Sequence, residues 1–415
     1  MSAPHIVFSV ALGLILLHWL GGFCLDHLNQ REVESHRGAV PTTLRNMIDP
    51  VTHAKSTEYT LAKLRLGGWE EAWGTVVLIA VLASGLLPAW YARWGLTADA
   101  SAWKQAAWLL ATAVLLGLTS LPFDWWSQFR LEERFGFNTT TPTTWLIDRL
   151  KGLLLAGAIG FPLLMLLLKW VNWMGSHWWI WAWVTLFAVQ LLLLILAPIL
   201  ILPLFNRFTP LPDGTLRERL LQLGEKTGFS ARTIQVMDGS KRSRHSNAYF
   251  TGFGRFRKIV LFDTLVGQLT EPELEAVLAH EIGHYKRGHI PQRLLWAAVS
   301  SLAAFALIGW LARQSWFLAA FGFPPNAGVA PALLLFMLLG SAVTFWFSPL
   351  GNLWSRHHEY EADRYAREAV GGADPLIGAL RKLSEKNLTN LTPHPWYSGF
   401  HYSHPTLVER EAALR

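Results

Sequence analysis

The sequence predicts an α-helical integral membrane protein with seven transmembrane helices and a small α+β domain inserted between the fifth and the sixth. Three observations lead to this fold class. Hydrophobic residues make up 52% of the 415 residues and charged residues only 16%, whereas soluble proteins carry about a quarter charged residues. Seven apolar runs approach or exceed the length that crosses a ~30 Å hydrocarbon layer. The basic residues divide unequally between the two sides that these runs define.

Each predicted span is a run without Lys, Arg, Asp or Glu. The fourth is the shortest, with 17 residues. The seven runs are residues 6–25, 73–91, 106–123, 152–168, 178–205, 294–311 and 332–354.

The placement of Lys and Arg supports seven spans independently. If all seven runs cross, 32 of the 36 basic residues fall on one side of the membrane and four on the other. If one helix fewer or one helix more preceded the long connection after the fifth span, connections rich in basic residues and connections poor in them would fall on the same side. The positive-inside rule then predicts a cytoplasmic C-terminus and an N-terminus on the outer side. Because this bias explains the net charge of +7, we expect no nucleic-acid partner.

The compartment is predicted from signals that the sequence lacks. The first run has neither a basic segment before it nor a small-residue cleavage site after it, so it predicts a retained helix. The chain is compact and contains no organelle retrieval signal, which favours a bacterial inner membrane over the endoplasmic reticulum. Its single cysteine, Cys24, excludes a disulfide framework and a cysteine-based metal site.

Two connections are too long for simple turns. Residues 26–69 are polar and are expected to cap the bundle. The connection after the fifth span has the pattern of an α+β domain. Its expected elements are a helix at 216–226, a strand at 233–237, and two adjacent strands at 247–253 and 258–262 with Gly252 and Gly254 between them. The chain thus divides into 1–205 with five spans, 206–290 as the inserted domain, 291–354 with two spans, and 355–415 as a C-terminal segment.

A further helix of the inserted domain begins at residues 270–273, Thr-Glu-Pro-Glu, which form a capping box with proline in the first turn. Apolar residues then recur at helical spacing and form an inner stripe. The stripe comprises Leu274, Val277, Leu278 and Tyr285. His280 and His284 lie off this stripe and are free to face a cavity. We expect the helix to lead straight into the sixth span, with the two histidines at or just inside the membrane level.

Residues 280–284 are His-Glu-Ile-Gly-His, the most informative motif of the chain. Residues four apart on an α-helix differ by about 40° in direction, so the two imidazoles project from one face and can hold one zinc ion. Glu281 is then placed to take a proton from a zinc-bound water. The position of the motif beside the membrane argues against a chance occurrence in an ordinary soluble helix.

A catalytic zinc site needs a third protein ligand and keeps a fourth position for water. His289 is near in sequence, but nine residues along a continuous helix put it about 180° from His280, so it joins only if the helix breaks. Glu359 and Asp363, just after the seventh span, share a helix face from which Glu361 points away. We therefore expect Glu359 to be the third ligand and Asp363 to orient one ligating histidine.

These residues resemble a known family, the type I CAAX prenyl proteases, which are membrane zinc endopeptidases. The resemblance covers most of the chain in ordered blocks. Besides the metal motif, the blocks are 132–138 with Asp148 and Lys151, 205–211, 240–243, 247–250, 261–265, 355–356 with 359–363, and 404–406 with Glu409 and Arg410.

The resemblance implies a fold of seven spans around a large internal chamber, with a zincin-like domain that binds one Zn²⁺ per chain. It implies the same third ligand, Glu359. His289 also matches the family pattern, and we can assign it no role beyond packing.

Roles in substrate binding follow from the resemblance alone. It implies that Asn247, Ala248 and Tyr249 belong to an edge strand against which an extended substrate pairs. It also implies that His404 stabilises the oxyanion, with Arg410 nearby at the substrate.

Each of these residues has an alternative interpretation without a catalytic role. The alternatives are a salt bridge of Glu359 with Arg356 or Arg364, a helix-face charge at Asp363, a loop amide at Asn247 and a surface imidazole at His404.

The expected reaction is hydrolysis of a peptide bond by zinc-activated water. Glu281 would carry the proton to the leaving amine, and His404, with Asn247, would hold the developing negative charge. The resemblance implies removal of the last three residues after a prenylated cysteine. The expected partners are a peptide or protein substrate, with or without a prenyl group, and the lipid bilayer; the sequence does not predict an oligomeric state.

Three other functions remain open at this point. A membrane quality-control metalloprotease without a prenyl substrate shares the metal motif, although the smaller heat-shock type has fewer spans. An intramembrane protease carries the motif within an apolar helix, which Lys286 and Arg287 argue against. A membrane scaffold or transporter with a relic site is disfavoured because all four candidate metal-site residues are intact.

Overall fold

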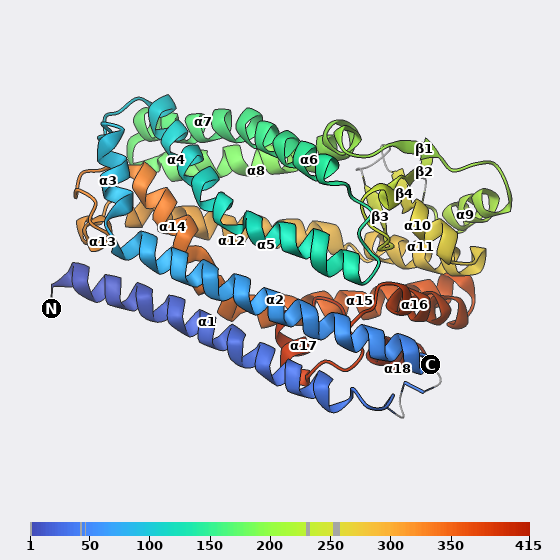
Figure 1. The fold of residues 1–415 in the computed structure, drawn as a ribbon. Helices are drawn as coiled ribbons and strands as arrows, with labels where there is room; N and C mark the ends of the chain where they lie inside the picture. The colour runs from blue at the N-terminus through green and yellow to red at the C-terminus, as the bar shows by residue number, and fades with distance from the viewer. Residues whose placement is uncertain (1, 42–43, 46, 230–232, 252–257) are drawn as a thin grey trace.

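The computed structural model describes residues 2–41, 44–45, 47–229, 233–251 and 258–415. Long helices lie side by side in a bundle, and a small sheet with further helices lies at one end of it (Figure 1). The two chain termini lie at opposite ends of the molecule.

The first two helices are longer than the apolar runs that predicted them. Helix α1 spans Ala3–Ser35 and α2 spans Pro50–Ala83. Most of the segment 26–69, which is expected to cap the bundle, continues these two helices. Polar residues extend them beyond the hydrocarbon layer, and Asp49 accepts two backbone hydrogen bonds from the first turn of α2.

Six helical segments of the described chain are long and apolar enough to cross a membrane. One of them, Pro142–Phe205, has 64 residues and would extend ~96 Å if straight, about three hydrocarbon thicknesses. It instead reverses at Gly175, whose φ is +50°, so that α7 (Phe161–Met174) and α8 (Trp178–Leu196) pack along each other. This reversal is consistent with two crossings; the total of seven stays a prediction.

The remaining helices of the first half cover the end of the second predicted span, the third predicted span and the start of the fourth. They are α3 (Leu86–Arg93), α4 (Ala102–Gly117), α5 (Leu121–Trp126) and α6 (Pro142–Leu155).

The last membrane segment runs directly to the end of the molecule where the sheet lies. Helix α14 (Val329–Thr344), a short turn at Phe345–Phe347 and α15 (Ser348–Val370) form one 42-residue helical run. The predicted domain boundary at residue 354 falls inside α15. The other helices of this half are α12 (His289–Leu311), α13 (Ser315–Ala320), α16 (Asp374–Lys386), α17 (Pro395–His401) and α18 (Leu407–Leu414).

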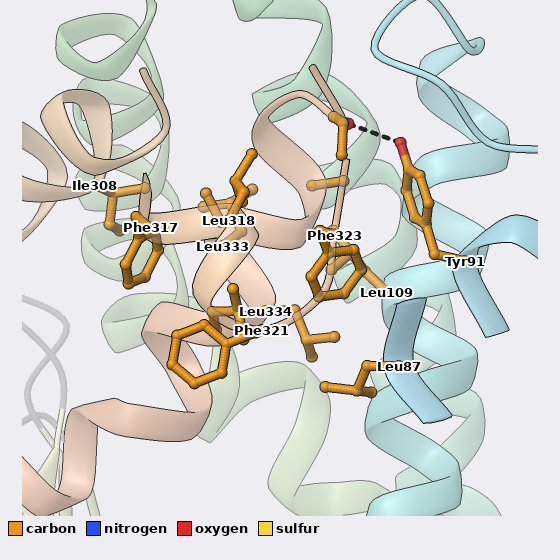
Figure 2. Packing of buried hydrophobic residues seen from close by; sticks show 14 of the residues in the cluster. Leu87, Tyr91, Leu109, Ile308, Phe317, Leu318, Phe321, Phe323, Leu333 and Leu334 are labelled. Atoms are coloured by element: carbon orange, nitrogen blue, oxygen red, sulfur yellow. Dashed lines mark hydrogen bonds between the residues drawn. The ribbon is translucent and has the colours of Figure 1, made fainter. Parts of the chain in front are cut away.

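A dense apolar cluster holds the end of the bundle far from the sheet. Figure 2 shows Phe317, Phe321 and Phe323 packed against leucines of α3, α4 and α14. At the edge of this cluster the Tyr91 hydroxyl donates a hydrogen bond to the Ala327 carbonyl at 2.7 Å, which satisfies the one polar atom of that buried ring. The cluster ties the second, third, sixth and seventh predicted spans together.

The inserted domain contains a four-stranded sheet of order β1-β2-β4-β3. Strand β2 (Thr233–Met237) pairs parallel with β4 (Lys258–Phe262), and β1 (Phe208–Pro210) and β3 (Ala248–Thr251) add antiparallel on the two sides. The three predicted strands are confirmed, and β3 has a free edge among the described strands. The predicted end of that strand, with Gly252, Phe253 and Gly254, lies outside the described residues.

Three helices cover the sheet: α9 (Thr215–Lys226), α10 (Asp263–Gln268) and α11 (Glu271–Lys286). The capping box of α11 is confirmed, and its apolar stripe is buried or packs against the domain core. The expected continuation into the sixth span is wrong, because Gly288 takes a left-handed conformation with φ of +72° and separates α11 from α12.

Candidate metal centre

Two helices from distant parts of the sequence meet at the metal motif. Helix α11 carries His280 and His284, and α15 carries Glu359. Their backbones approach closely at Gly283, where an added Cβ would lie 3.0 Å from the Ala362 Cα and 3.1 Å from its carbonyl oxygen. A glycine at this position therefore permits the crossing that brings the carboxylate to the imidazoles.

Three ligand atoms converge at this crossing. His280 Nε2 lies 3.2 Å from His284 Nε2, and the Glu359 carboxylate oxygens lie 3.4 Å and 3.3 Å from those two nitrogens. A tetrahedral ion ~2.0–2.1 Å from each ligand requires separations of ~3.3–3.4 Å between them. Each imidazole nitrogen thus faces a different oxygen of the Glu359 carboxylate, and each separation is close to the length of one edge of a zinc coordination tetrahedron.

The chemistry of these atoms also fits a cation. The Glu359 side chain is only 2% exposed, and its Oε2 atom has no hydrogen-bond partner among the described residues. Burial lowers the pKa of His280, but the neighbouring carboxylates of Asp363 and Glu359 outweigh that effect and raise the pKa to about 9. The two carboxylates thus attract positive charge to this point.

Asp363 lies where the helix spacing predicted, beside the other nitrogen of His280. Its Oδ1 atom is 2.8 Å from His280 Nδ1, and its Oδ2 atom accepts a hydrogen bond from Arg410 Nε at 2.8 Å. The Arg410 side chain is 11% exposed and its Nη1 lies 4.0 Å from Glu359 Oε2. Arg410 therefore holds Asp363 in place, a different contact from the predicted one with substrate.

The alternative of a Glu359 salt bridge on the same helix is not favoured. Arg356 donates instead to backbone carbonyls of Ser398 and Tyr402, at 2.8 Å and 3.2 Å. Arg364 is exposed on another face of the helix.

Glu281 is half-buried beside the converging ligands. Burial is the main cause that raises the pKa of Glu281, and the imidazoles of His280 and His284 oppose that effect. A carboxyl group with a raised pKa accepts and releases a proton closer to neutral pH, as a general base must.

His404 approaches the same carboxylate from the loop between α17 and α18. Its Nε2 lies 3.4 Å from Glu359 Oε1, and its Nδ1 lies 3.0 Å from the Ser403 hydroxyl. His404 also lines a cavity of about 700 Å³, together with Tyr59, Lys63 and other residues of α2 and the C-terminal segment. His404 therefore lies between this cavity and the Glu359 carboxylate.

The residues predicted to pair with substrate lie on or next to β3. Ala248 and Tyr249 belong to the strand, and Asn247 precedes it with an exposed side chain whose oxygen accepts from the Ala248 N–H at 2.8 Å. The side chain of Tyr249 lies outside the described part of the structure. Strand β3 contacts α11, the helix that carries the metal motif.

The position of His289 could not be derived from helical spacing. The break at Gly288 turns the chain so that His289 Nδ1 lies 2.9 Å from His284 Nδ1. A glycine directly after Lys286 and Arg287 is a common helix-termination signal, and it would have indicated this break.

Family models match both halves of the chain. Residues 29–207 match the model described as CAAX prenyl protease N-terminal, five membrane helices, and residues 210–415 match the model of peptidase family M48. The chain belongs to the CAAX prenyl protease group of peptidase family M48.

Curated relatives of this M48 protease extend over nearly the whole chain. CAAX prenyl protease 1 of Saccharomyces cerevisiae is 36% identical over 90% of this chain and 88% of its own length. The homologue from Homo sapiens is 31% identical over 100% and 96%. The crystal structure of S. mikatae Ste24p superposes with a TM-score of 0.87 at 33% identity, covering 100% of this chain and 99% of that one.

These comparisons confirm that the M48 protease is a multi-pass membrane metalloendopeptidase that hydrolyses peptide bonds in peptide or protein substrates. The relatives named above are eukaryotic, so they give no support to the predicted bacterial inner membrane.

Proposed function

We propose that this protease binds one Zn²⁺ per chain through His280, His284 and Glu359. The observation that supports this most directly is the approach of the two Nε2 atoms, 3.2 Å apart, to the two oxygens of the Glu359 carboxylate at 3.4 Å and 3.3 Å. Two imidazoles and one carboxylate are a known ligand set of catalytic zinc and keep one coordination position for water.

Each residue near the three ligands can be assigned a role in peptide hydrolysis. A zinc ion held by these three residues would lower the pKa of a bound water toward ~7 and polarise the scissile carbonyl. Glu281 takes the proton of the attacking water and passes it to the leaving amine. His404, with Asn247, donates hydrogen bonds to the oxyanion. Asp363, clamped by Arg410, holds His280 in the tautomer whose Nε2 lone pair faces the metal.

The substrate binds as an extended peptide along β3 in this proposal. The free edge of β3 offers backbone groups of Ala248 and Tyr249 for pairing, and its contact with α11 directs the peptide toward the metal ligands. Asn247 lies at the end of this edge and is exposed.

We further propose that the catalytic end faces the cytoplasm and that prenylated C-termini are among the substrates. The orientation rests on the distribution of basic residues. The substrate class rests on the names of the relatives, which are CAAX prenyl proteases. Removal of a C-terminal tripeptide is the reaction to test first.

The decisive variant is Glu281→Gln. It keeps the shape of the side chain and all three metal ligands but removes the base, so zinc content should stay at one per chain while kcat falls about 10²- to 10⁴-fold. Zinc is measured by metal analysis of the purified protein and turnover with a fluorogenic peptide. The matched control is Glu275→Gln on the same helix, where the carboxylate pairs with Arg219 instead.

Substantial residual turnover in Glu281→Gln would overturn the assignment of the base. Loss of zinc from that variant would show that Glu281 acts through the metal ligands instead. A wild-type protein without zinc would remove the basis of the whole proposal.

Cleavage of a matched pair of peptides, with and without a farnesyl group, tests the substrate class. Cleavage of the farnesylated peptide alone supports CAAX processing. Equal cleavage of both supports the alternative of a membrane quality-control protease.

A further inference from the structure

The two histidines of the metal motif are supported in different ways. Each directs its Nε2 atom toward Glu359, so each needs a hydrogen on Nδ1 to be a neutral ligand. The Nδ1 of His280 faces the carboxylate of Asp363 at 2.8 Å. The Nδ1 of His284 faces another imidazole, that of His289, at 2.9 Å.

His289 in turn lies against a carboxylate. Its Nε2 is 2.9 Å from Glu361 Oε2, and its side chain is 1% exposed. A neutral imidazole donates through one nitrogen and accepts through the other. One proton arrangement therefore satisfies the whole chain: His284 Nδ1–H donates to His289 Nδ1, and His289 Nε2–H donates to Glu361.

The ring of His289 is held in this orientation by its surroundings. The left-handed Gly288 starts a new helix at His289 and so turns it toward His284. The ring of His358 stacks on that of His289 with centroids 3.9 Å apart and planes 7° from parallel. His358 Nε2 lies 3.2 Å from Gln292 Oε1, which fixes the plane of the stack.

We propose that His289 and Glu361 are positioning residues that act on the metal through His284. This inference rests on the proposed zinc site. A carboxylate at the end of the chain of hydrogen bonds selects the tautomer of His284, fixes its ring and strengthens it as a ligand, as Asp363 does directly for His280. Helix α15 thus supports both imidazoles, from Asp363 on one side and from Glu361 on the other.

A second metal ion is the competing interpretation, because His289, His358 and Glu361 also bring ligand atoms within 4.8 Å of one another. Two features argue against it. An ion bound to His289 Nε2 would displace the proton that His289 donates to Glu361. An ion bound to His289 Nδ1 would instead occupy the lone pair that accepts the hydrogen bond from His284 Nδ1–H. An ion in the plane of one stacked ring also lies outside the plane of the other.

The experiment compares four variants in full-length protein. Glu361→Gln weakens the hydrogen bond between His289 and residue 361. His289→Leu removes both hydrogen bonds of the series from His284 to Glu361, and His289→Asn keeps an acceptor near the position of Nδ1. Glu368→Gln, an exposed carboxylate on the same helix, is the matched control. The measurements are zinc Kd by chelator competition, metal stoichiometry, the absorption spectrum of the Co²⁺-substituted protein, and Tm of the metal-free protein.

We expect His289→Leu to raise the zinc Kd about 10- to 100-fold, and Glu361→Gln and His289→Asn to raise it less. Each should alter the Co²⁺ spectrum, while the metal-free Tm of Glu361→Gln and all properties of the control stay unchanged. A zinc Kd within twofold of wild type in both Glu361→Gln and His289→Leu would overturn the inference. A fall in the metal-free Tm that parallels the loss of zinc affinity would also overturn the inference. The same holds if the wild type binds two metal ions per chain and Glu361→Gln binds one. If the wild type binds no zinc, the proposed function itself fails.

Discussion

At the scale of single residues, the centre depends on carboxylates that are buried but paired with cations or imidazoles. Glu359 and Asp363 are each 2% exposed and contact His280, His284 and Arg410. A buried carboxylate without such partners is strongly disfavoured. Removing any one partner therefore disturbs the others, and single substitutions here should act on metal binding as well as on turnover.

His404 offers a test that separates catalysis from metal binding. In His404→Gln we expect kcat to fall about 10²- to 10³-fold with little change in KM or zinc content, because an oxyanion donor acts mainly in the transition state. Steady-state kinetics and metal analysis measure both effects. His401→Gln, which lines the same cavity, is the control. An unchanged kcat in His404→Gln would exclude this role.

Helical spacing could predict the position of some residues of the site but not of others. His280, His284, Glu359 and Asp363 lie on continuous helices, where spacing in sequence converts directly into direction. His289 could not be placed in this way, because a left-handed glycine intervenes between it and the motif.

At the scale of elements, the crossing of α11 and α15 sets the size of the site. The two helices come from either side of the last two predicted spans, and Gly283 permits their close approach. The apolar stripe of α11 faces the opposite way, into the domain core. Periodicity predicted both faces of α11, but the partner helix followed only from the motif chemistry, since no local pattern specifies a contact between distant helices.

Gly283→Ala tests this crossing. The added Cβ must displace Ala362 backbone atoms at 3.0 to 3.1 Å, so we expect a loss of about 1–3 kcal/mol in stability and a weaker zinc Kd. Thermal unfolding and chelator competition measure the two effects. Gly340→Ala on α14, where an added Cβ meets nothing within 4 Å, should leave both unchanged. Equal zinc affinity in both variants would show that the crossing does not determine the site.

At the scale of the whole molecule, the metal joins parts of the chain that membrane spans separate. His280 and His284 precede the sixth predicted span, and Glu359 follows the seventh. Composition and charge predicted the membrane spans and the side on which each connection lies, because the bilayer requires apolar spans and favours basic residues on one side. The extension of α1 and α2 beyond the membrane was missed, since polar helical residues there carry no hydrophobic signal.

Metal removal should therefore destabilise the whole protein. A ligand at a thousand times its Kd stabilises the folded state by ~4 kcal/mol, so a chelator should lower Tm and added zinc should restore it. Thermal unfolding in detergent measures this change. The Tm of Glu359→Gln should respond far less to chelator. An identical Tm of the wild type with and without chelator would contradict this linkage.

The unbroken passage from α14 to α15 has a mechanical consequence. Glu359 lies about 16 Å along the axis from the start of α15, so a tilt of about 4° at the turn Phe345–Phe347 would shift its carboxylate by about 1 Å. The distance between a metal ion and its ligand atom can deviate from its preferred value by only about 0.2 Å. Tilting is one response of a spanning helix to a mismatch with lipid thickness, so lipid thickness should tune hydrolysis from a distance, and turnover in vesicles of short- and long-chain lipids should differ accordingly.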